Sequence, residues 1–264
     1  LSTYRVDNYL GFSRVSAEEL VRKMVDHLHD LEILDTYGEV LSIERVGSAY
    51  RVHTDVDTYD SKAIIIAAGT HPKPLGLANE SEYLSQGLSY CAVCDGIFFQ
   101  GKNVAVVGGG DSALEESLYL AEISNHVTII HDLDQLTASA GLIKRVNSHD
   151  TITVMPHTRV TQLNGLKKLA SIDVIDLKTQ QSNTIAVDGL FVYVGNQPKT
   201  DFVKGLGILD SDGFIKVDHE MKTKMPGIFA CGDVTKKDYR LIATAISDGA
   251  IAALSAVKYL DHLE

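Results

Sequence analysis

The stretch that decides the fold is VAVVGGGDSALEESLYLAEISNHVTII, residues 104–130. Val104–Val107 is a short apolar run that predicts a buried strand, and Gly108–Gly110 predict a tight turn after it. Ser112–Ile123 carries apolar residues at helical spacing, and Val127–Ile130 predicts a second strand. This order of strand, turn, helix and strand predicts a complete βαβ unit with two parallel strands in one sheet.

The turn between the first strand and the helix matches the pattern G-x-G-x-x-A at Gly108, Gly110 and Ala113. In this pattern the first glycine makes the turn, the second lets a pyrophosphate approach the backbone, and the small third residue lets helix and strand pack closely. Free N–H groups at the start of the helix then face the phosphates. The pattern favours a dinucleotide site, and a glycine-rich turn without a ligand stays open as the alternative.

The end of the second strand discriminates between nucleotides in such a unit, and here it reads HDLDQLT at 131–137. An acidic side chain at this place accepts the ribose hydroxyls of NAD, whereas arginine suits the extra phosphate of NADP. The segment has two carboxylates, at Asp132 and Asp134, and no arginine. It therefore favours NAD over NADP, or no pyridine nucleotide at all, and solvated loop acids are the alternative.

Two amphipathic or apolar helices lie outside this unit. Ser16 and Glu19 form a capping box in front of a helix predicted at 17–34. Its apolar residues fall on one helical face, and they are Leu20, Val21, Met24, Val25, Leu28 and Leu31. Leu241–Leu260 predicts a long, largely apolar helix that we expect to be buried.

Further strands alternate with these helices, which predicts α/β layers. They are expected at 42–46, 50–54, 63–68, 151–155, 172–177, 184–187, 189–194 and 228–231.

A Cys-x-x-Cys pair, Cys91 and Cys94, is the clearest chemical motif. Zinc usually needs two such pairs or added histidines, and the only other cysteine is Cys231, which ends a strand and is expected to be buried. A redox dithiol fits better, because two thiols at this spacing close a small disulfide ring and the spacing lowers the pKa of one thiol. Asp95 follows directly and is a candidate for relaying a proton. Zinc, an inert pair and a plain turn aspartate remain the alternatives.

Gly232 and Asp233 come after the apolar strand at 228–231 and shortly before the long helix. A carboxylate at such a strand end can hold a sugar or ribityl hydroxyl, and the helix N-terminus can stabilise negative charge on a bound ring. A simple turn aspartate is the alternative.

Composition sets the outer limits of function. The chain has 264 residues, enough for about two domains, and a formal charge of −11. That charge argues against a surface for nucleic acid or an anionic membrane, and no apolar run is long enough for a transmembrane helix. Three cysteines do not make a disulfide scaffold, so we expect a reducing compartment, the cytoplasm.

Several blocks together resemble the low-molecular-weight thioredoxin reductases over essentially the whole chain. They are Ser89–Gly96 (SYCAVCDG), Val104–Gly110 with Glu115 and Glu116, Val6–Phe12 (VDNYLGF), Ala67–Thr70 (AAGT), Gly195 with Pro198, and Pro226–Asp233 (PGIFACGD).

The resemblance implies a homodimeric α/β flavoprotein with two Rossmann-like nucleotide-binding domains of the pyridine nucleotide-disulfide oxidoreductase type, the second inserted in the first. FAD would lie in the domain of residues 1–71 and 196–264. Residues 72–195 would form the pyridine-nucleotide domain that carries the Cys-x-x-Cys. Electrons in this family pass from NADPH to FAD, to the disulfide and to thioredoxin, while the inserted domain swings on its two connections.

The resemblance also assigns roles to residues. Cys91 and Cys94 match the redox-active pair, and Asp95 matches the proton donor. The residues that match FAD-binding positions are Asn8, Gly69, Thr70, Gly232, Asp233, Arg240, Leu241 and Ile242. The residues expected to bind pyridine nucleotide are Gly108, Gly110, Ala113 and Asp132.

Two departures from the family matter. The family carries roughly forty residues before Leu1, a βαβ start whose G-x-G-x-x-G cradles the FAD pyrophosphate, and we expect the natural protein to have them. The NADP-selecting pattern His-Arg-Arg-x-x-x-Arg has here lost its arginines to Asp132, Leu133 and Thr137. NADH or reduced ferredoxin are therefore alternative donors. A different protein disulfide as acceptor and a redox-sensing nucleotide-binding module are the alternative functions.

Overall fold

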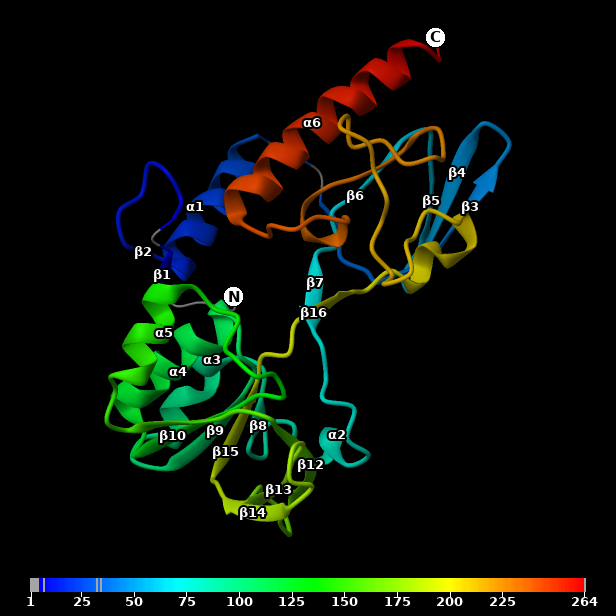
Figure 1. Ribbon diagram of the computed structural model, residues 1–264. Helices are drawn as coiled ribbons and strands as arrows, with labels where there is room; N and C mark the ends of the chain where they lie inside the picture. The colour runs from blue at the N-terminus through cyan, green and yellow to red at the C-terminus, as the bar shows by residue number, and fades with distance from the viewer. Residues whose placement is uncertain (1–4, 7, 32, 34, 264) are drawn as a thin grey trace. The chain divides into compact units, whose positions relative to one another are not determined.

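The computed structural model describes residues 5–6, 8–31, 33 and 35–263 of the chain. Internal contacts divide it into two compact units, each of which is described by itself below (Figure 1). Unit 1 holds Pro72–Gly195 together with short pieces near the N-terminus, and unit 2 holds Val6–Val15, Glu19–His71 and Asn196–Glu264. The functional assignment of these units as domains stays a proposal.

Unit 1 is built on a five-stranded parallel sheet with the strand order β11-β10-β9-β15-β8. The strands are β8 (Leu88–Ser89), β9 (Asn103–Val107), β10 (His126–Ile130), β11 (Ile152–Met155) and β15 (Gly189–Val192). Helices α3 (Ala92–Asp95), α4 (Asp111–Ile123) and α5 (Ala140–Asn147) pack with one another beside this sheet, and α2 (Glu80–Tyr83) and the 3-10 helix η1 (Gly96–Phe99) complete the unit.

The predicted βαβ unit is confirmed as β9, α4 and β10. The two strands run parallel in a register that pairs Val104 with Val127 and Val107 with Ile130. Ala113 and Leu114 of α4 are almost completely buried against the sheet, as the helical spacing of apolar residues predicts.

A three-stranded antiparallel sheet adjoins the parallel one in unit 1. Its strands are β12 (Thr158–Asn164), β13 (Ser171–Asp176) and β14 (Ser182–Ala186), in that order. The sequence did not predict β12, because the register shifts between Val160 and Gln162 and breaks the alternation of buried residues.

Unit 2 contains smaller sheets. Strands β6 (Ile64–Ile66) and β17 (Ile228–Ala230) pair in parallel, and β3 (Val40–Val46), β4 (Ala49–Thr54) and β5 (Thr58–Ser61) form an antiparallel sheet. The remaining elements are the strands β1 (Arg5–Val6) and β2 (Val15–Ser16), the 3-10 helices η2 (Asp201–Leu206) and η3 (Gly232–Val234), and the helices α1 (Ala17–Asp30) and α6 (Ile242–Asp261). In the part of the chain that is described, no helix is long and apolar enough to cross a membrane.

The apolar face predicted for α1 is largely exposed to solvent. Leu20 is buried, but Leu28 and Leu31 are 52% and 58% exposed, and Val21 and Val25 also face solvent. Within the described residues this helix has an apolar stripe that little else covers. The helix ends at Asp30, and Glu32 and Leu34 of the predicted range lie outside the described residues.

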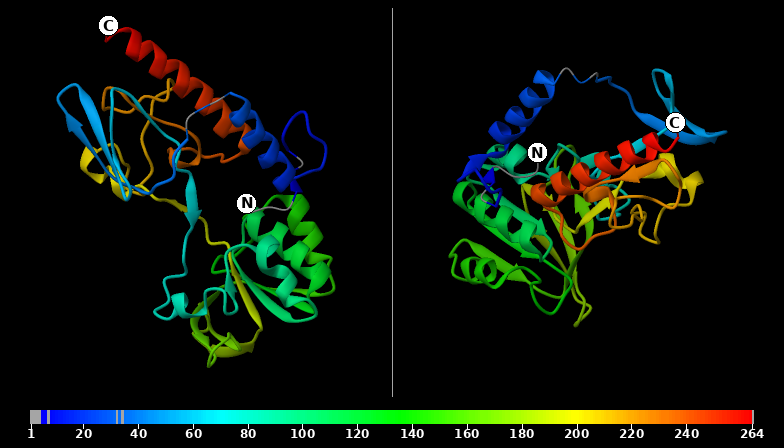
Figure 2. Two further views of the ribbon diagram at one scale, coloured as in Figure 1. Left: turned by 180° about the vertical axis from the view of Figure 1, so that it is seen from behind. Right: turned by 90° about the horizontal axis from the view of Figure 1, so that it is seen from above.

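The long C-terminal helix is present as predicted, but the expectation that it is buried is wrong. Figure 2 shows α6 as one continuous helix whose colour runs from orange to red. It buries a narrow face of small residues, with Ala252 and Ala256 packed against Phe229, while Leu254 and Val257 are 67% and 55% exposed. A largely apolar helix is expected to be buried, yet among the described residues it is the small-residue face of α6 that packs closely.

The two crossings of the chain between the units pair with each other. Strand β7 (Thr70–Pro72) lies next to β16 (Asn196–Pro198) in a two-stranded sheet. The backbone N–H of Lys73 donates to the carbonyl of Gly195 at 2.9 Å. The two ends of the Pro72–Gly195 segment therefore lie side by side.

Candidate functional site

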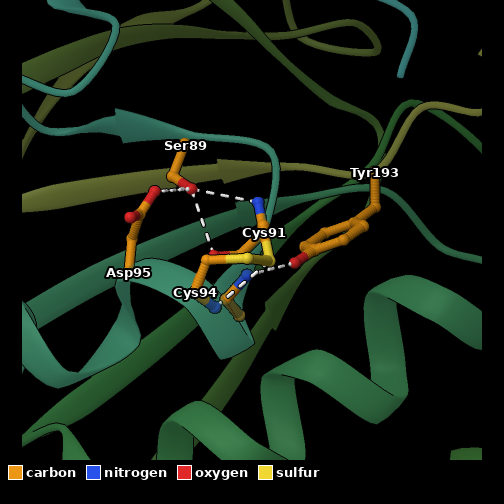
Figure 3. Close-up of a disulfide and its surroundings, with 6 residues drawn as sticks. Ser89, Cys91, Cys94, Asp95 and Tyr193 are labelled. Atoms are coloured by element: carbon orange, nitrogen blue, oxygen red, sulfur yellow. Dashed lines mark hydrogen bonds between the residues drawn. A yellow bond between two sulfur atoms is a disulfide. The ribbon is translucent and has the colours of Figure 1, made fainter. Parts of the chain in front are cut away.

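Cys91 and Cys94 form a disulfide where β8 passes into α3 (Figure 3). Cys91 is the residue that caps the N-terminus of α3, and its Sγ accepts a hydrogen bond from the backbone N–H of Cys94 at 3.1 Å. This hydrogen bond would stabilise a thiolate on Cys91 once the disulfide is reduced. The sulfurs bond to each other, which agrees with the redox interpretation of the motif.

Ser89 connects the disulfide to Asp95. Its hydroxyl donates to Asp95 Oδ2 at 2.6 Å, and its oxygen accepts the backbone N–H of Cys91 at 3.0 Å. The Cys91 carbonyl, at 3.2 Å, is a competing acceptor for the same hydroxyl proton, and the shorter contact to a carboxylate is the stronger one. Asp95 is thus joined through the Ser89 hydroxyl to the backbone of Cys91.

Tyr193 connects the disulfide to the glycine loop of the same unit. Its hydroxyl accepts the backbone N–H of Ala92, between the two cysteines, at 2.7 Å. Burial, followed by the nearby charge of Glu116, raises the pKa of Tyr193, so the phenol keeps its proton at neutral pH. The same residue's backbone carbonyl lies against Gly108.

Gly108, Gly110 and Ala113 form the turn between β9 and α4 that the pattern predicts. Gly108 has φ of +141°, and a Cβ there would stand 2.3 Å from the Tyr193 carbonyl oxygen, so only glycine fits. Gly110 is the N-cap of α4, and a Cβ there would meet only Thr137, at 3.8 Å. The turn is therefore closed on the Tyr193 side and open at Gly110, where a phosphate can approach.

Asp132 stands just beyond the end of β10, but it does not stand alone. Arg159 of β12 reaches it with Nη2 3.1 Å from Asp132 Oδ2. The sequence between 131 and 137 has no arginine, and the fold supplies one from 27 residues further along the chain.

Three of the FAD candidates, Gly69, Gly232 and Asp233, follow the ends of β6 and β17. These strands are parallel neighbours, and the Cys231 N–H donates to the Ile66 carbonyl, so Gly69 and Gly232 follow adjacent strand ends. Gly232 has φ of +72° and donates its N–H to Asp248 Oδ2 at 3.0 Å. Asp248 also pairs with Lys237, and both side chains are largely buried.

The remaining FAD candidates differ in how closely they approach this turn. Arg240 lies close, since its Nε is 3.4 Å from the Asp233 carbonyl and its guanidinium lies 4.5 Å from the Phe214 ring centroid. Leu241 and Ile242 begin α6 with partly exposed side chains, and Thr70 begins β7. Asn8 is exposed in a separate loop of the same unit. Among the described residues, no hydrogen bond or ion pair joins it to the other FAD candidates.

The model of the family described as "Pyridine nucleotide-disulphide oxidoreductase" matches residues 12–249. The thioredoxin reductase of Bacillus subtilis (strain 168) is 38% identical over 267 aligned residues, which cover 100% of this chain and 84% of that protein. The chain belongs to this family.

Solved structures agree with the family match. The Lactococcus lactis thioredoxin reductase superposes with a TM-score of 0.95 at 40% identity, over 99% of this chain and 86% of that one. The T. acidophilum thioredoxin reductase gives 0.90 at 36% identity, over 100% and 86%. The expected fold, two Rossmann-like domains of the pyridine nucleotide-disulfide oxidoreductase type, is thereby confirmed.

Family membership makes FAD the cofactor, and the residues of unit 2 fit it. Asp233 Oδ1 is buried and, among the described residues, has no hydrogen-bond partner. A buried carboxylate oxygen without a donor is costly, which is what a position built for a ligand hydroxyl shows before the ligand binds. Asp233 would hold the ribityl or sugar hydroxyls, and Arg240 would lie along the ring.

Several residues of these sites were not singled out by the sequence reading. Tyr193 directly follows β15 and Arg159 lies in β12, both far along the chain from the motif, and no local pattern marks them. Ile97 and Phe98 carried a signal that could have been used, because two large apolar residues directly follow the Cys-x-x-Cys-Asp-Gly motif. They are 57% and 70% exposed in η1, which directly follows α3.

Glu116 of α4 is a further titratable group near this site that the sequence reading named only as part of a motif. It is 7% exposed, its Oε2 is buried without a hydrogen-bond partner among the described residues, and its charge acts on Tyr193. Burial, followed by the charge of Glu115, raises the pKa of Glu116 to about 7 from its ordinary 4.5. A protonated form of Glu116 is therefore populated at neutral pH.

This raised pKa predicts a pH-dependent stability. Below about pH 4.5 both the folded and the unfolded chain keep the proton on Glu116, so its contribution to stability is fully present there. Between about pH 4.5 and 7 the unfolded chain ionises while the folded chain still holds the proton, so roughly 3 kcal/mol is lost across this range and no more is lost above it. We expect Glu116→Gln to remove that loss, measured as the difference in urea midpoint between about pH 5 and about pH 8.

The matched control is Glu122→Gln on the exposed side of the same helix, which should leave the pH dependence as it is in the unmodified chain. Equal pH dependence in the unmodified chain and Glu116→Gln would contradict the assignment.

Proposed function

We propose that this chain is a flavin-dependent thioredoxin reductase in which the Cys91–Cys94 pair carries two electrons to the disulfide of thioredoxin. The observation that carries the proposal is the disulfide itself. Its Cys91 Sγ accepts a hydrogen bond from the Cys94 N–H, and Ser89 joins the Cys91 backbone to Asp95. The full-length similarity to thioredoxin reductases supports the choice of acceptor.

The proposed reaction is a balanced two-electron exchange between two disulfides. Two electrons and two protons open the Cys91–Cys94 disulfide to two thiols, and Asp95 is placed to hold or deliver one of the protons. One thiolate of the pair then attacks the partner's disulfide and forms a mixed disulfide. The other thiolate attacks that bond, which releases the partner as a dithiol and restores the Cys91–Cys94 disulfide.

The two units divide the work in this proposal. Residues 1–71 and 196–264 bind FAD through Gly69, Asp233 and Arg240, and residues 72–195 carry the glycine loop and the disulfide. When bound, FAD supplies two-electron transfer between the donor and the disulfide. The unpartnered Asp233 oxygen and the open face of Gly110 support this division.

An exposed apolar pair next to the disulfide supports a protein as the acceptor. Ile97 and Phe98 present their side chains to solvent one turn after Cys94. Aromatic and aliphatic side chains at such a place form the centre of protein interfaces. A small disulfide protein that covers them brings its own disulfide close to Cys91 and Cys94.

We further propose that the protein works in the cytoplasm as a homodimer. Free Cys231 and the redox cycling of Cys91 with Cys94 both fit a reducing compartment. The exposed apolar side chains of α6, Leu254 and Val257 among them, offer a surface that a second copy can cover.

The decisive experiment follows the flavin spectrum of the purified protein under anaerobic conditions. NADH, NADPH and reduced ferredoxin are supplied in parallel. We expect at least one of these donors to bleach the flavin and oxidised thioredoxin to restore its colour. Reoxidation by a different disulfide protein alone would change the acceptor. A protein that binds nucleotide but shows no turnover with any disulfide would be a redox-sensing module and would overturn the proposal.

A further inference from the structure

The segment after β10 is fixed next to the glycine loop by backbone hydrogen bonds. The N–H groups of Thr137 and Ala138 both donate to the Gly109 carbonyl, at 2.8 and 3.2 Å. On its other side the His131 carbonyl accepts from Thr158 at 2.9 Å. Because both ends are held, Asp132 cannot move far from the place where a dinucleotide on the loop would put its adenosine ribose.

Each acidic side chain of this segment has a basic partner from elsewhere in unit 1. Asp132 pairs with Arg159 at 3.1 Å, and Asp134 pairs with His157 at 3.2 Å and Lys178 at 3.4 Å. A phosphate arriving here would have to displace a carboxylate from its partner and would then stand beside that carboxylate. Like charges at this separation repel, and the repulsion favours a ligand without an extra phosphate.

His131 gives no compensating positive charge. It is 4% exposed, and its ring packs against Gly109, since a Cβ on that glycine would lie 3.5 Å from the His131 side chain. Burial and the neighbouring His157 lower its pKa, which keeps the imidazole neutral near pH 7. Its buried Nδ1 has no hydrogen-bond partner among the described residues, so this side of the loop offers a neutral polar atom.

We propose that the Gly108 loop takes a non-phosphorylated adenine dinucleotide, NADH, and that Asp132, held in place by Arg159, is the residue that selects it. The carboxylate of Asp132 is half exposed and accepts hydrogen bonds from the ribose 2′- and 3′-hydroxyls. Leu133, also about half exposed, lies next to it as an apolar surface for the adenine. This inference rests on the proposed function, because it names the donor of that enzyme.

The test measures binding of two probes to the full chain by calorimetry: ADP-ribose and its 2′-phosphorylated form. We expect ADP-ribose to bind at least about tenfold more tightly. Asp132→Asn should reduce that preference by a similar factor, and Asp132→Arg combined with Leu133→Arg should reverse it. Asp150→Asn, at an exposed position of the same unit, makes the same charge change as Asp132→Asn and should leave the preference unchanged.

Three outcomes would overturn the inference: equal binding of the two probes, tighter binding of the phosphorylated probe, or no binding of either at millimolar concentration. Since Asp132 is half exposed, its variants should fold, and their melting temperatures check this. If neither probe binds but reduced ferredoxin drives thioredoxin reduction, the proposed function stands and only the NADH assignment falls. If no donor drives thioredoxin reduction although ADP-ribose binds, the proposed function falls instead.

Discussion

Replacing either Cys91 or Cys94 with serine abolishes thioredoxin reduction and leaves flavin binding intact. We expect this result because two electrons leave the pair only if both sulfurs take part: one forms the mixed disulfide and the other resolves it. Each single variant should therefore lower turnover to the uncatalysed level. With Cys91→Ser, the Cys94 N–H also loses its sulfur acceptor. The measurement is steady-state reduction of thioredoxin, with flavin content read from the visible spectrum.

The third cysteine supplies the control. Cys231 is buried, and burial together with the Asp248 carboxylate raises the pKa of its thiol, so it is a poor nucleophile. Cys231→Ala should keep turnover close to that of the unmodified chain. Turnover that survives Cys94→Ser but disappears with Cys231→Ala would move the reactive sulfur to unit 2 and would contradict the proposed function.

Asp233→Ala should have opposite effects on flavin affinity and on the stability of the flavin-free chain. The buried Oδ1 of Asp233 has no donor among the described residues, so a bound flavin hydroxyl gains a charge-assisted hydrogen bond there. We expect flavin affinity to fall at least about tenfold, since hydrogen bonds to charged groups contribute about 1.5–3 kcal/mol. In the flavin-free chain the substitution removes an unsatisfied carboxylate and should raise the melting temperature.

Two titrations test this pair of effects: flavin binding followed by fluorescence, and thermal unfolding of the flavin-free chain. Asp238→Ala serves as the control, because Asp238 is exposed in the same loop and should change neither quantity. A loss of stability in flavin-free Asp233→Ala would mean that the carboxylate only supports the turn.

The local part of the fold is predictable from the sequence, and the reasons lie in particular residues. The run of Val104–Val107, the glycines after it and the apolar spacing of α4 each agree with the same βαβ structure, so β9, α4 and β10 form where predicted. Strand β12 escaped the prediction because a bulge breaks its period. Burial of α6 was predicted wrongly, and the apolar face of α1 is largely exposed, because a sequence pattern shows which residues are apolar but not whether anything covers them.

The chemistry was predictable where it is written in neighbouring residues and not where it depends on contacts across the sequence. Cys91, Cys94 and Asp95 are adjacent in a motif, and the structure places them together with Ser89. The partner of Asp132 could not be foreseen, because Arg159 reaches it only through the packing of β12 beyond β10. The roles of the nucleotide-binding residues stay predictions until binding is measured.

The paired crossings β7 and β16 make the segment between them a natural unit for domain grafting. Lys73 and Gly195 touch through a backbone hydrogen bond, so Pro72–Gly195 leaves and re-enters the chain at almost one point. Segments with adjacent ends can be exchanged between homologous chains without stretching the host. A chimaera that receives the corresponding segment of a relative would need only two junctions. The exchanged segment would carry both the residues proposed to select the donor and the dithiol.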